Sequence, residues 1–202
     1  MVSTLAASCC NAPKEAPAAE ENPVIANIMA RRSVRQYTDQ VVPREMLQQI
    51  AECGVNAPNA MNKQQWEVRI IDNAAFLNDV SAVMKEAMPQ MPGADDPKSR
   101  NMFRNATAAI AVACPDDPSG MSLINVGLLA ENVCLAAASL GLGSVVMAGP
   151  VMMLNNAPAA KPWLDRLNLS EGYKLRLIIG LGYPDEAPEA RPRDLDKIQF
   201  VD

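Results

Sequence analysis

The stretch that decides the fold runs from residue 121 to residue 143 and reads MSLINVGLLAENVCLAAASLGLG. Its first twenty residues carry a single charge, on Glu131. A helix that is apolar on nearly every side is stable only when it is buried. Gly141 and Gly143 follow the last apolar turn, and glycine is the residue that most often ends a helix. The sequence therefore predicts a long central helix, closed by these glycines, around which the rest of the chain packs.

Short apolar segments on both sides of this helix have the length of strands. Three of them lie at 107–114, 144–148 and 174–182. A fourth begins at Trp66, where apolar and polar residues alternate up to Ile70 as in a half-buried strand. Because these strands are few, uneven and interleaved with helices, we predict an α+β sandwich.

Three segments before the central helix show helical patterns. Asn22 and Pro23 form an N-cap and first-turn pair ahead of apolar residues at helical spacing. A second helix starts at Pro43, and a third covers 76–87. Residues 89–99 combine prolines, a glycine and aspartates, which predicts a loop. We expect the ordered domain to span residues 23–202.

The composition excludes several classes of function. The 202 residues are 49% hydrophobic and 20% charged, which suits one domain with a sizeable core. A net charge of −5 leaves no basic excess to neutralise the phosphates of a nucleic acid. The chain has no histidine, so it lacks Ser/His and Cys/His nucleophile pairs and the commonest transition-metal ligand. We expect no nucleic-acid partner, no metal site, and a cofactor that carries the reactive chemistry.

Residues 1–22 differ in composition from the rest of the chain. Leu5 to Cys9, followed by a segment rich in Ala, Pro and Glu, resembles the end of a bacterial lipoprotein signal and its tether. The basic region that such a signal needs is missing here, and the alternative is a disordered tail on a cytoplasmic protein. Lipidation of Cys9 and an envelope location are therefore left open. No apolar run is isolated enough to predict an integral membrane span.

Three of the five cysteines, Cys53, Cys114 and Cys134, lie inside apolar stretches, and none forms a C-x-x-C pair. Cysteine packs as a small hydrophobe, so buried free thiols are expected at these positions. The sequence gives them no role beyond packing.

A basic segment, Arg31-Arg32-Ser33-Val34-Arg35, follows the first predicted helix. Cations at the C-terminal end of a helix interact favourably with its dipole, so a structural role explains the segment taken alone. Three guanidinium groups and a hydroxyl within five residues also suit phosphate, because guanidinium pairs bidentately with phosphate oxygens. The segment is therefore a candidate anion site with a structural alternative.

Three further segments have ordinary structural interpretations when each is taken alone. Residues 57–66, APNAMNKQQW, place polar amides before a strand, where they suit the edge of a heterocycle. Residues 140–150, LGLGSVVMAGP, contain a helix cap and a tight turn, but no G-x-G-x-x-G phosphate loop. Arg191-Pro192-Arg193 forms a basic pair in a proline-rich C-terminal arm.

Taken in order, the four segments resemble the FMN-dependent nitroreductase family over about residues 23–200. That family has a basic R-x-S-x-R/K segment, a P-S-x-x-N-x-Q-P-W segment, a G-L-G turn before a short strand, and a closing basic pair. Residues 125–132 are similar to its central helix. The resemblance implies a three-layer sandwich, in which helices flank a mainly antiparallel sheet, and an intertwined homodimer with two FMN sites at its interface.

The resemblance implies that the basic residues anchor the cofactor. Arg31, Arg32 and Ser33 would hold the FMN phosphate and the ribityl chain. Arg191 and Arg193 would add charge from the C-terminal arm.

Other matched residues would surround the flavin ring. Arg35 would lie at its pyrimidine edge and stabilise the negative charge that develops there on reduction. The backbone amides of Ala148 and Gly149 would point at flavin N5 and O4, with Met147 beside the ring. Four residues would reach the cofactor from the neighbouring subunit: Pro58, Asn59, Asn62 and Gln64.

Departures from the family pattern concern the surroundings of the ring. Asn59 replaces a serine, Gln65 replaces the proline before Trp66, and Val146 stands where Trp or Pro is common. A lysine that some members place near flavin N1 has no secure counterpart, since Lys98 and Arg100 are only neighbours of the right region. FMN binding remains expected, and the identity of the substrate is open.

The resemblance implies a hydride relay in which NADH or NADPH reduces FMN and the flavin then reduces a nitroaromatic, a quinone or a similar small acceptor. No catalytic side chain is expected, because the cofactor carries the chemistry. Alternatives on the same fold are reductive dehalogenation and flavin fragmentation, which commonly need lid residues that the 85–105 region does not suggest. A non-catalytic flavin-binding envelope protein is the remaining alternative. The sequence does not distinguish NADH from NADPH.

Overall fold

The computed structural model describes residues 22–90 and 94–201. The expectations for a lipoprotein signal or a disordered tail, and for Cys9, concern a segment that lies outside the described residues. The helices are α1 (Pro23–Ala30), α2 (Arg44–Val55), α3 (Ala74–Ala87), α4 (Met121–Ser139), α5 (Gly149–Asn156) and α6 (Lys161–Arg166). The strands are β1 (Glu67–Ile71), β2 (Ala108–Pro115), β3 (Gly143–Met147) and β4 (Tyr173–Gly182). Single 3-10 turns occur at Ala60–Asn62, Pro158–Ala160 and Leu195–Lys197.

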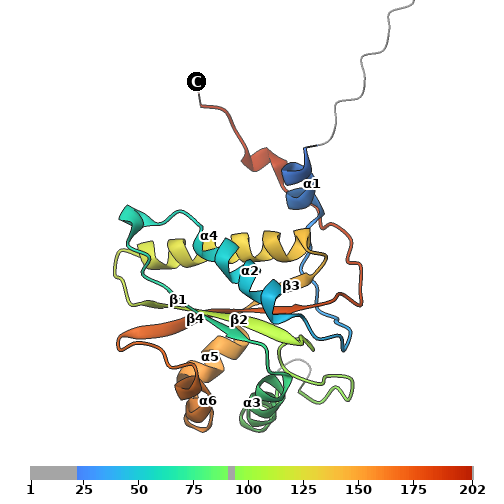
Figure 1. The fold of residues 1–202 in the computed structure, drawn as a ribbon, viewed down its shortest axis with the longest axis vertical. Helices are drawn as coiled ribbons and strands as arrows, with labels where there is room; N and C mark the ends of the chain where they lie inside the picture. The colour runs from blue at the N-terminus through green and yellow to red at the C-terminus, as the bar shows by residue number, and fades with distance from the viewer. Residues whose placement is uncertain (1–21, 91–93, 202) are drawn as a thin grey trace, which may run out of the picture.

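The four strands form one antiparallel sheet in the order β1-β2-β4-β3. Helices α2 and α4 cover one face of the sheet, and α1 lies outside α4; α3, α5 and α6 cover the other face (Figure 1). The chain therefore forms three layers, as the resemblance implies.

Strand β2 shows why the apolar segments of this chain are continuous. Ala109 and Ala111 pack on the layer of α3, whereas Ile110 and Val112 pack on the layer of α2 and α4. Because a strand buried on both faces needs apolar residues at every position, the alternation typical of a half-buried strand disappears.

Helix α4 is the predicted central helix. Its inner face, which includes Leu129 and Val133, is buried on the sheet and α2. Gly141 ends it with φ of 76°, and its N–H donates to the Ala138 carbonyl at 3.0 Å while the next N–H reaches Ala137. This is the left-handed glycine ending that the sequence predicts. The helix is long and apolar enough to cross a membrane, a test that a buried core helix also passes.

Gly143 does not close α4, contrary to the prediction, but begins strand β3. A Cβ at this position would lie 2.8 Å from the Cβ of Val34, so the glycine lets the basic segment approach the strand. Strand β3 also ends at Met147, one residue earlier than expected, because Ala148 is the N-cap of α5.

Two helices were not predicted. Pro150 and Pro162 lie in the first turns of α5 and α6, where proline is tolerated because the first N–H groups have no intrahelical partner. Cys114 and Cys134 are buried as expected, but the prediction was wrong for Cys53, which is exposed on α2. The neighbouring Gly54 occupies the buried position against α4 instead.

Candidate functional site

The basic segment leaves α1 and runs beside β3. Ser33 forms a parallel β-bridge with Ser144, and the N–H of Val34 donates to the Ser144 carbonyl at 3.0 Å. Beneath the segment, the Tyr37 hydroxyl donates to the Val34 carbonyl at 2.6 Å. Burial raises the pKa of Tyr37 above its usual value, so this phenol remains a hydrogen-bond donor at neutral pH. The segment is therefore fixed from two sides.

Arg31 and Arg32 make contacts within the protein that agree with the structural interpretation of the basic segment. Arg31 Nε lies 3.5 Å from the Glu131 carboxylate of α4. Arg32 Nη1 donates to the carbonyls of Met29 and Arg31, at 2.6 and 2.8 Å, at the end of α1. Each guanidinium has five N–H donors, so these bonds leave others for an anion.

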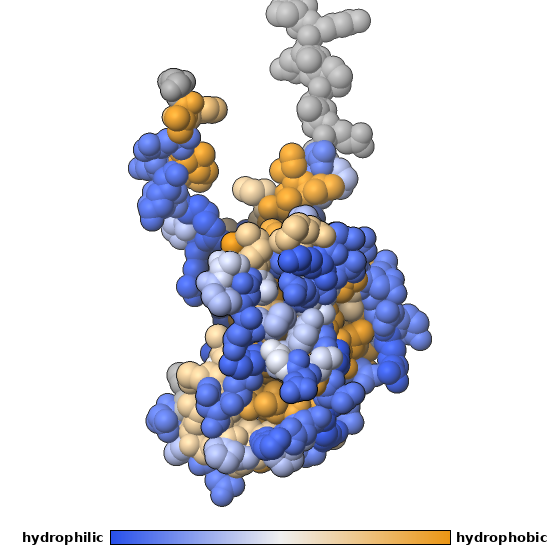
Figure 2. Space-filling model, turned by 90° about the vertical axis from the view of Figure 1, so that its left-hand side faces the viewer, coloured by the Kyte–Doolittle hydropathy of each residue, from blue (hydrophilic) through white to orange (hydrophobic). Residues whose placement is uncertain are grey.

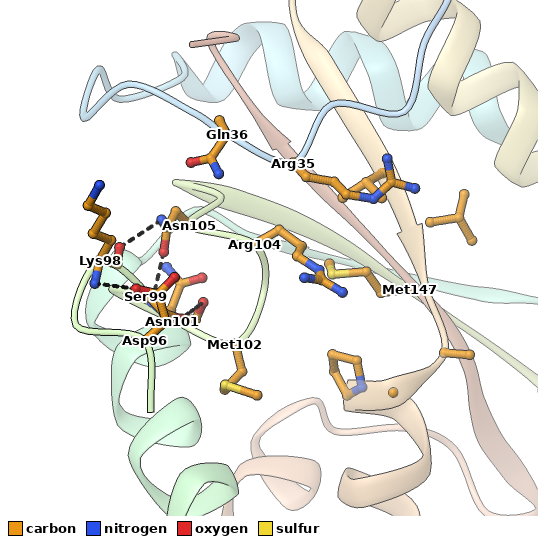
Figure 3. A pocket seen from close by; sticks show the side chains of 15 residues that line it. Arg35, Gln36, Asp96, Lys98, Ser99, Asn101, Met102, Arg104, Asn105 and Met147 are labelled. Atoms are coloured by element: carbon orange, nitrogen blue, oxygen red, sulfur yellow. Dashed lines mark hydrogen bonds between the residues drawn. The ribbon is translucent and has the colours of Figure 1, made fainter. Parts of the chain in front are cut away.

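Arg35 lines a cavity of about 360 Å³ at the end of β3 (Figure 3). Met147 is buried at its floor, and Ala148 and Gly149 bring the N-terminus of α5 to its wall. The first amides of a helix lack intrahelical acceptors, and this end of the helix dipole is positive. The cavity thus joins a guanidinium, helix amides and a polarisable thioether.

The opposite wall of the cavity is the loop that precedes β2. It contributes Lys98, Asn101, Arg104 and Asn105, together with the carboxylate Asp96. Three cations and one carboxylate therefore line the cavity, although the chain as a whole has a net charge of −5. This distribution favours an anionic or electron-rich occupant.

Arg104 was missed by the sequence analysis, which named Lys98 and Arg100 only as neighbours. The signal that could have found it is a cation beside an asparagine directly before a buried strand, where a turn must reverse the chain. Arg100 instead holds the loop to the body, through an ion pair with Asp39 and a hydrogen bond of 2.8 Å to the Tyr37 carbonyl.

The C-terminal arm begins beside the basic segment. The carboxylate of Glu186 accepts a hydrogen bond from the N–H of Arg35, and the N–H of Asp185 donates to the Gln36 carbonyl at 2.9 Å. Farther along, Arg191 and Arg193 are exposed, and Arg193 Nη1 donates to the Arg191 carbonyl at 3.0 Å. Across the described residues, no hydrogen bond or ion pair joins either arginine to the basic segment.

The loop of residues 57–66 lies at the other end of α4 from β3 (Figure 1). It contains Pro58, Asn59, Asn62 and Gln64. The N–H of Ala60 in this loop donates to Asn125 Oδ1, in the second turn of α4, at 3.3 Å. Asn59 Oδ1 accepts from the N–H of Gln64 at 2.8 Å and fixes the loop. Within one subunit, this loop contributes nothing to the cavity that Arg35 lines.

Comparison with known proteins identifies the family. The sequence model of the Nitroreductase family matches residues 28–183. A protein of Methanothermobacter thermautotrophicus named NADH dehydrogenase/NAD(P)H nitroreductase is 28% identical over 181 residues, which cover 88% of this chain and 86% of that protein. The NADPH-flavin oxidoreductase of Vibrio harveyi is 29% identical over 188 residues, 85% of this chain and 70% of that protein.

The fold agrees with this assignment. A nitroreductase from Desulfitobacterium hafniense DCB-2, solved with bound FMN, superposes with a TM-score of 0.80 at 26% identity. The match covers 91% of this chain and 100% of that structure. The α+β sandwich expected from the sequence is therefore confirmed, and the chain belongs to the nitroreductase family.

Proposed function

We propose that the chain is an FMN-dependent oxidoreductase, which takes electrons from NADH or NADPH and reduces a small acceptor such as a nitroaromatic compound or a quinone. The observation that carries this proposal is the cavity where Arg35, Met147 and the N-terminus of α5 meet. The names of the relatives support the reaction class, and the FMN in the similar structure supports the cofactor.

The residues present fit FMN. The cavity volume of about 360 Å³ lies within the range of small-molecule sites. Arg31, Arg32 and Ser33 do not line the cavity, but they directly precede Arg35, which does, and they would hold the phosphate and ribityl chain beyond it. Arg191 and Arg193 would close on the phosphate from the C-terminal arm.

Bound FMN supplies the atom that exchanges hydride, and the chain supplies orientation and charge. The guanidinium of Arg35 would stabilise negative charge at the pyrimidine edge of the ring. The amides of Ala148 and Gly149, which line the same cavity, would face flavin N5 and O4, and the buried Met147 would lie beside the ring. The chain has no histidine, and water could deliver the protons that the acceptor takes up.

A homodimer would complete the site. Helix α1 has no buried residue, and an isolated helix of eight residues is marginal in water. Apolar side chains gather on α1 and at the end of the C-terminal arm, two projections from the body (Figure 2). The outer face of α4 adds Leu123 and Ile124, which are more than half exposed. Such a surface is typical of a subunit interface, and a second copy would bring Pro58, Asn59, Asn62 and Gln64 to the cofactor.

The visible spectrum of the purified protein tests this proposal. We expect a flavin band, stoichiometric FMN on reconstitution, and bleaching of the band when NADH or NADPH is added without oxygen. A nitroaromatic compound or a quinone should then restore the colour. A colourless protein that gains no FMN would exclude the proposed function, and bound FMN that neither nucleotide reduces would favour a non-catalytic flavin carrier.

A further inference from the structure

The C-terminal arm starts as an added strand, in which residues 183–186 run beside residues 35–38. An antiparallel β-bridge joins Tyr37 to Pro184, and backbone hydrogen bonds of 3.0 and 2.9 Å flank this bridge. Among the described residues, those of the arm after residue 186 form hydrogen bonds and ion pairs only with one another. The added strand is therefore where such bonds attach the arm to the body.

Glu186 ends this strand with a side-chain contact instead of a backbone contact. Its half-buried carboxylate accepts a hydrogen bond from the N–H of Arg35. A hydrogen bond from a backbone N–H to a carboxylate is roughly twice as strong as one between neutral groups. Because Arg35 is itself exposed, its N–H would be open to water without this carboxylate.

The side chain of Arg35 is held within its own segment, since its Nη1 donates to the Ser33 carbonyl at 3.0 Å. The neighbouring N–H of Val34 donates to the Ser144 carbonyl of β3, also at 3.0 Å. Strand β3 thus fixes the residue before Arg35, whereas the arm fixes Arg35 itself. In the part of the chain that the structure describes, Glu186 provides the hydrogen bond to Arg35 from outside the basic segment.

The position of Arg35 matters because the energy between two charges falls as their separation grows. A group that stabilises developing charge acts best when the protein holds it in place, within about 0.5 Å of the required geometry. Loss of the contact with Glu186 should therefore weaken the effect of Arg35 on the reduced flavin. The negative charge of Glu186 acts in the opposite direction, because a carboxylate disfavours a second negative charge nearby. Its position and its charge thus have opposite effects on the flavin.

We propose that Glu186 is a positioning residue for the flavin and that it acts through Arg35. Glu186 does not line the cavity, but its carboxylate fixes the backbone of a residue that does. The guanidinium then stays at the cavity wall when the ring gains negative charge. This inference rests on the proposed function and joins the arm that carries Arg191 and Arg193 to the redox behaviour of the cofactor.

Two substitutions separate the position of Glu186 from its charge. Glu186→Gln removes the charge but keeps an oxygen that can accept from the N–H of Arg35, whereas Glu186→Ala removes both. Because both variants lack the charge, the difference between them reports the hydrogen bond. Glu189→Gln, at an exposed carboxylate farther along the arm, is the control for loss of a negative charge outside this contact.

The flavin midpoint potential of Glu186→Ala should lie below that of Glu186→Gln. We expect the redox equilibrium to differ about threefold, which is about 14 mV for a two-electron couple in which tenfold corresponds to about 30 mV. In an Arg35→Ala background this difference should disappear, because no guanidinium remains to be positioned. Equal potentials of the two variants would overturn the proposal. A difference that persists in the Arg35→Ala background would also overturn it, because Glu186 would then not act through Arg35.

Amide hydrogen exchange tests the contact without the cofactor. In the FMN-free protein, NMR should show the N–H of Arg35 exchanging about fivefold faster in Glu186→Ala than in Glu186→Gln. The N–H of Val34, which bonds to β3, should exchange alike in both, and equal exchange at Arg35 would refute the positioning role. FMN content is measured first in every variant. A wild-type protein without FMN refutes the proposed function itself, whereas normal FMN content with equal potentials refutes the role of Glu186 alone.

Discussion

Arg31 and Arg35 belong to one segment, but their surroundings differ. Arg31 is half-buried and paired with Glu131, whereas Arg35 lies in the cavity, with Nη1 donating to the Ser33 carbonyl at 3.0 Å. Arg31, which is held on α4, is suited to anchor a phosphate group. Arg35, which lies in the cavity, is suited to stabilise the edge of a ring whose charge changes on reduction. Replacing the two arginines should therefore have different effects on cofactor binding and potential.

Arg35→Ala should lower the flavin midpoint potential and leave FMN largely bound, because the reduced state loses a favourable charge. A loss of about 1.4 kcal/mol in differential stabilisation corresponds to about 30 mV for a two-electron couple. Arg31→Ala should instead weaken FMN retention. Glu131→Gln controls for the lost ion pair, since it leaves Arg31 in place. Potentials from dye equilibration and FMN dissociation constants give the comparison, and equal loss of FMN from both alanine variants would contradict this division of roles.

Gly143 and Val34 set how closely the basic segment approaches β3. Gly143→Ala should destabilise the protein and weaken FMN binding, because a Cβ there would lie 2.8 Å from both the Cβ and the Cγ1 of Val34. Overpacking of this kind costs roughly 1–3 kcal/mol. Adding Val34→Ala to Gly143→Ala should recover part of the loss by making room. Denaturant unfolding of the two single variants and the double variant measures the coupling; strictly additive effects would show that the Cγ atoms of Val34 are not the cause, since the Cβ at residue 34 remains in the double variant.

At the scale of elements, the sequence could predict what depends on local pattern. The cap at Asn22, where Oδ1 accepts from the Val24 N–H at 3.0 Å, and the glycine ending of α4 both follow from local rules. Helices α5 and α6 were missed because they are short, with eight and six residues, and neither begins with a side-chain cap. Cys53 shows the same limit, because an apolar stretch does not reveal which helix face meets the core.

The candidate site was predictable only in part. The basic segment and the end of β3 are contiguous sequences with recognisable patterns, and the structure brings Arg35 and Met147 to one cavity. Arg104 enters that cavity through a left-handed turn that depends on the side chain of Asn105. Such a turn is set by tertiary hydrogen bonds, so no spacing rule in the sequence identifies the direction of the side chain.

The start of α4 should depend on pH through Asp117. Its carboxylate accepts from the N–H groups of Ser119 and Ser122, at 2.9 and 3.0 Å, and hydrogen bonding to Ser119 is the main cause that lowers its pKa to about 2. A depressed carboxyl pKa stabilises the fold above the unfolded value of about 3.9, and this contribution is lost as the pH falls toward 2. The stability advantage of wild type over Asp117→Ala should therefore shrink between about pH 4 and pH 2.

Asn73→Ala is the matched control for Asp117→Ala. Asn73 caps α3, with Oδ1 accepting from the Ala75 N–H at 2.9 Å, but its amide does not titrate. This variant should lose about 1 kcal/mol at every pH. Thermal unfolding of the three proteins from pH 2 to pH 6 makes the comparison. If the difference in stability between wild type and Asp117→Ala stays constant with pH, the charge of the carboxylate contributes nothing to stability.

At the scale of the whole molecule, the matched residues lie toward opposite ends of α4. A helix of 19 residues is about 28 Å long, since each residue adds about 1.5 Å. The loop with Asn62 contacts the first turns of this helix, whereas the basic segment pairs with β3 beyond its last turn. Within one subunit, the loop contributes no residue to the cavity that Arg35 lines. Both sets would contribute to one site if a second copy supplied the loop, as the proposed homodimer implies.

Subunit complementation tests this arrangement. Arg31→Ala and Asn62→Gly should each weaken FMN retention in their own homodimers; glycine is chosen because Asn62 has φ of 52°. A heterodimer of the two variants, isolated through two different affinity tags, would contain one site with both changes and one site with neither. It should therefore retain about half of the FMN of wild type, because a two-fold dimer places each residue in two equivalent sites.

The same heterodimer gives the opposite result if both residues act within one subunit. Each of its sites would then carry one change, and its FMN content would not exceed that of the homodimers. Arg44→Gln paired with Asn62→Gly provides the control, since Arg44 is exposed and lies outside the site. That pairing also retains about half of the FMN when the site is shared, because one loop is intact. Recovery with Arg31→Ala that reaches this level would show that segment and loop meet across the interface, while no recovery would place both residues in a site built by one subunit.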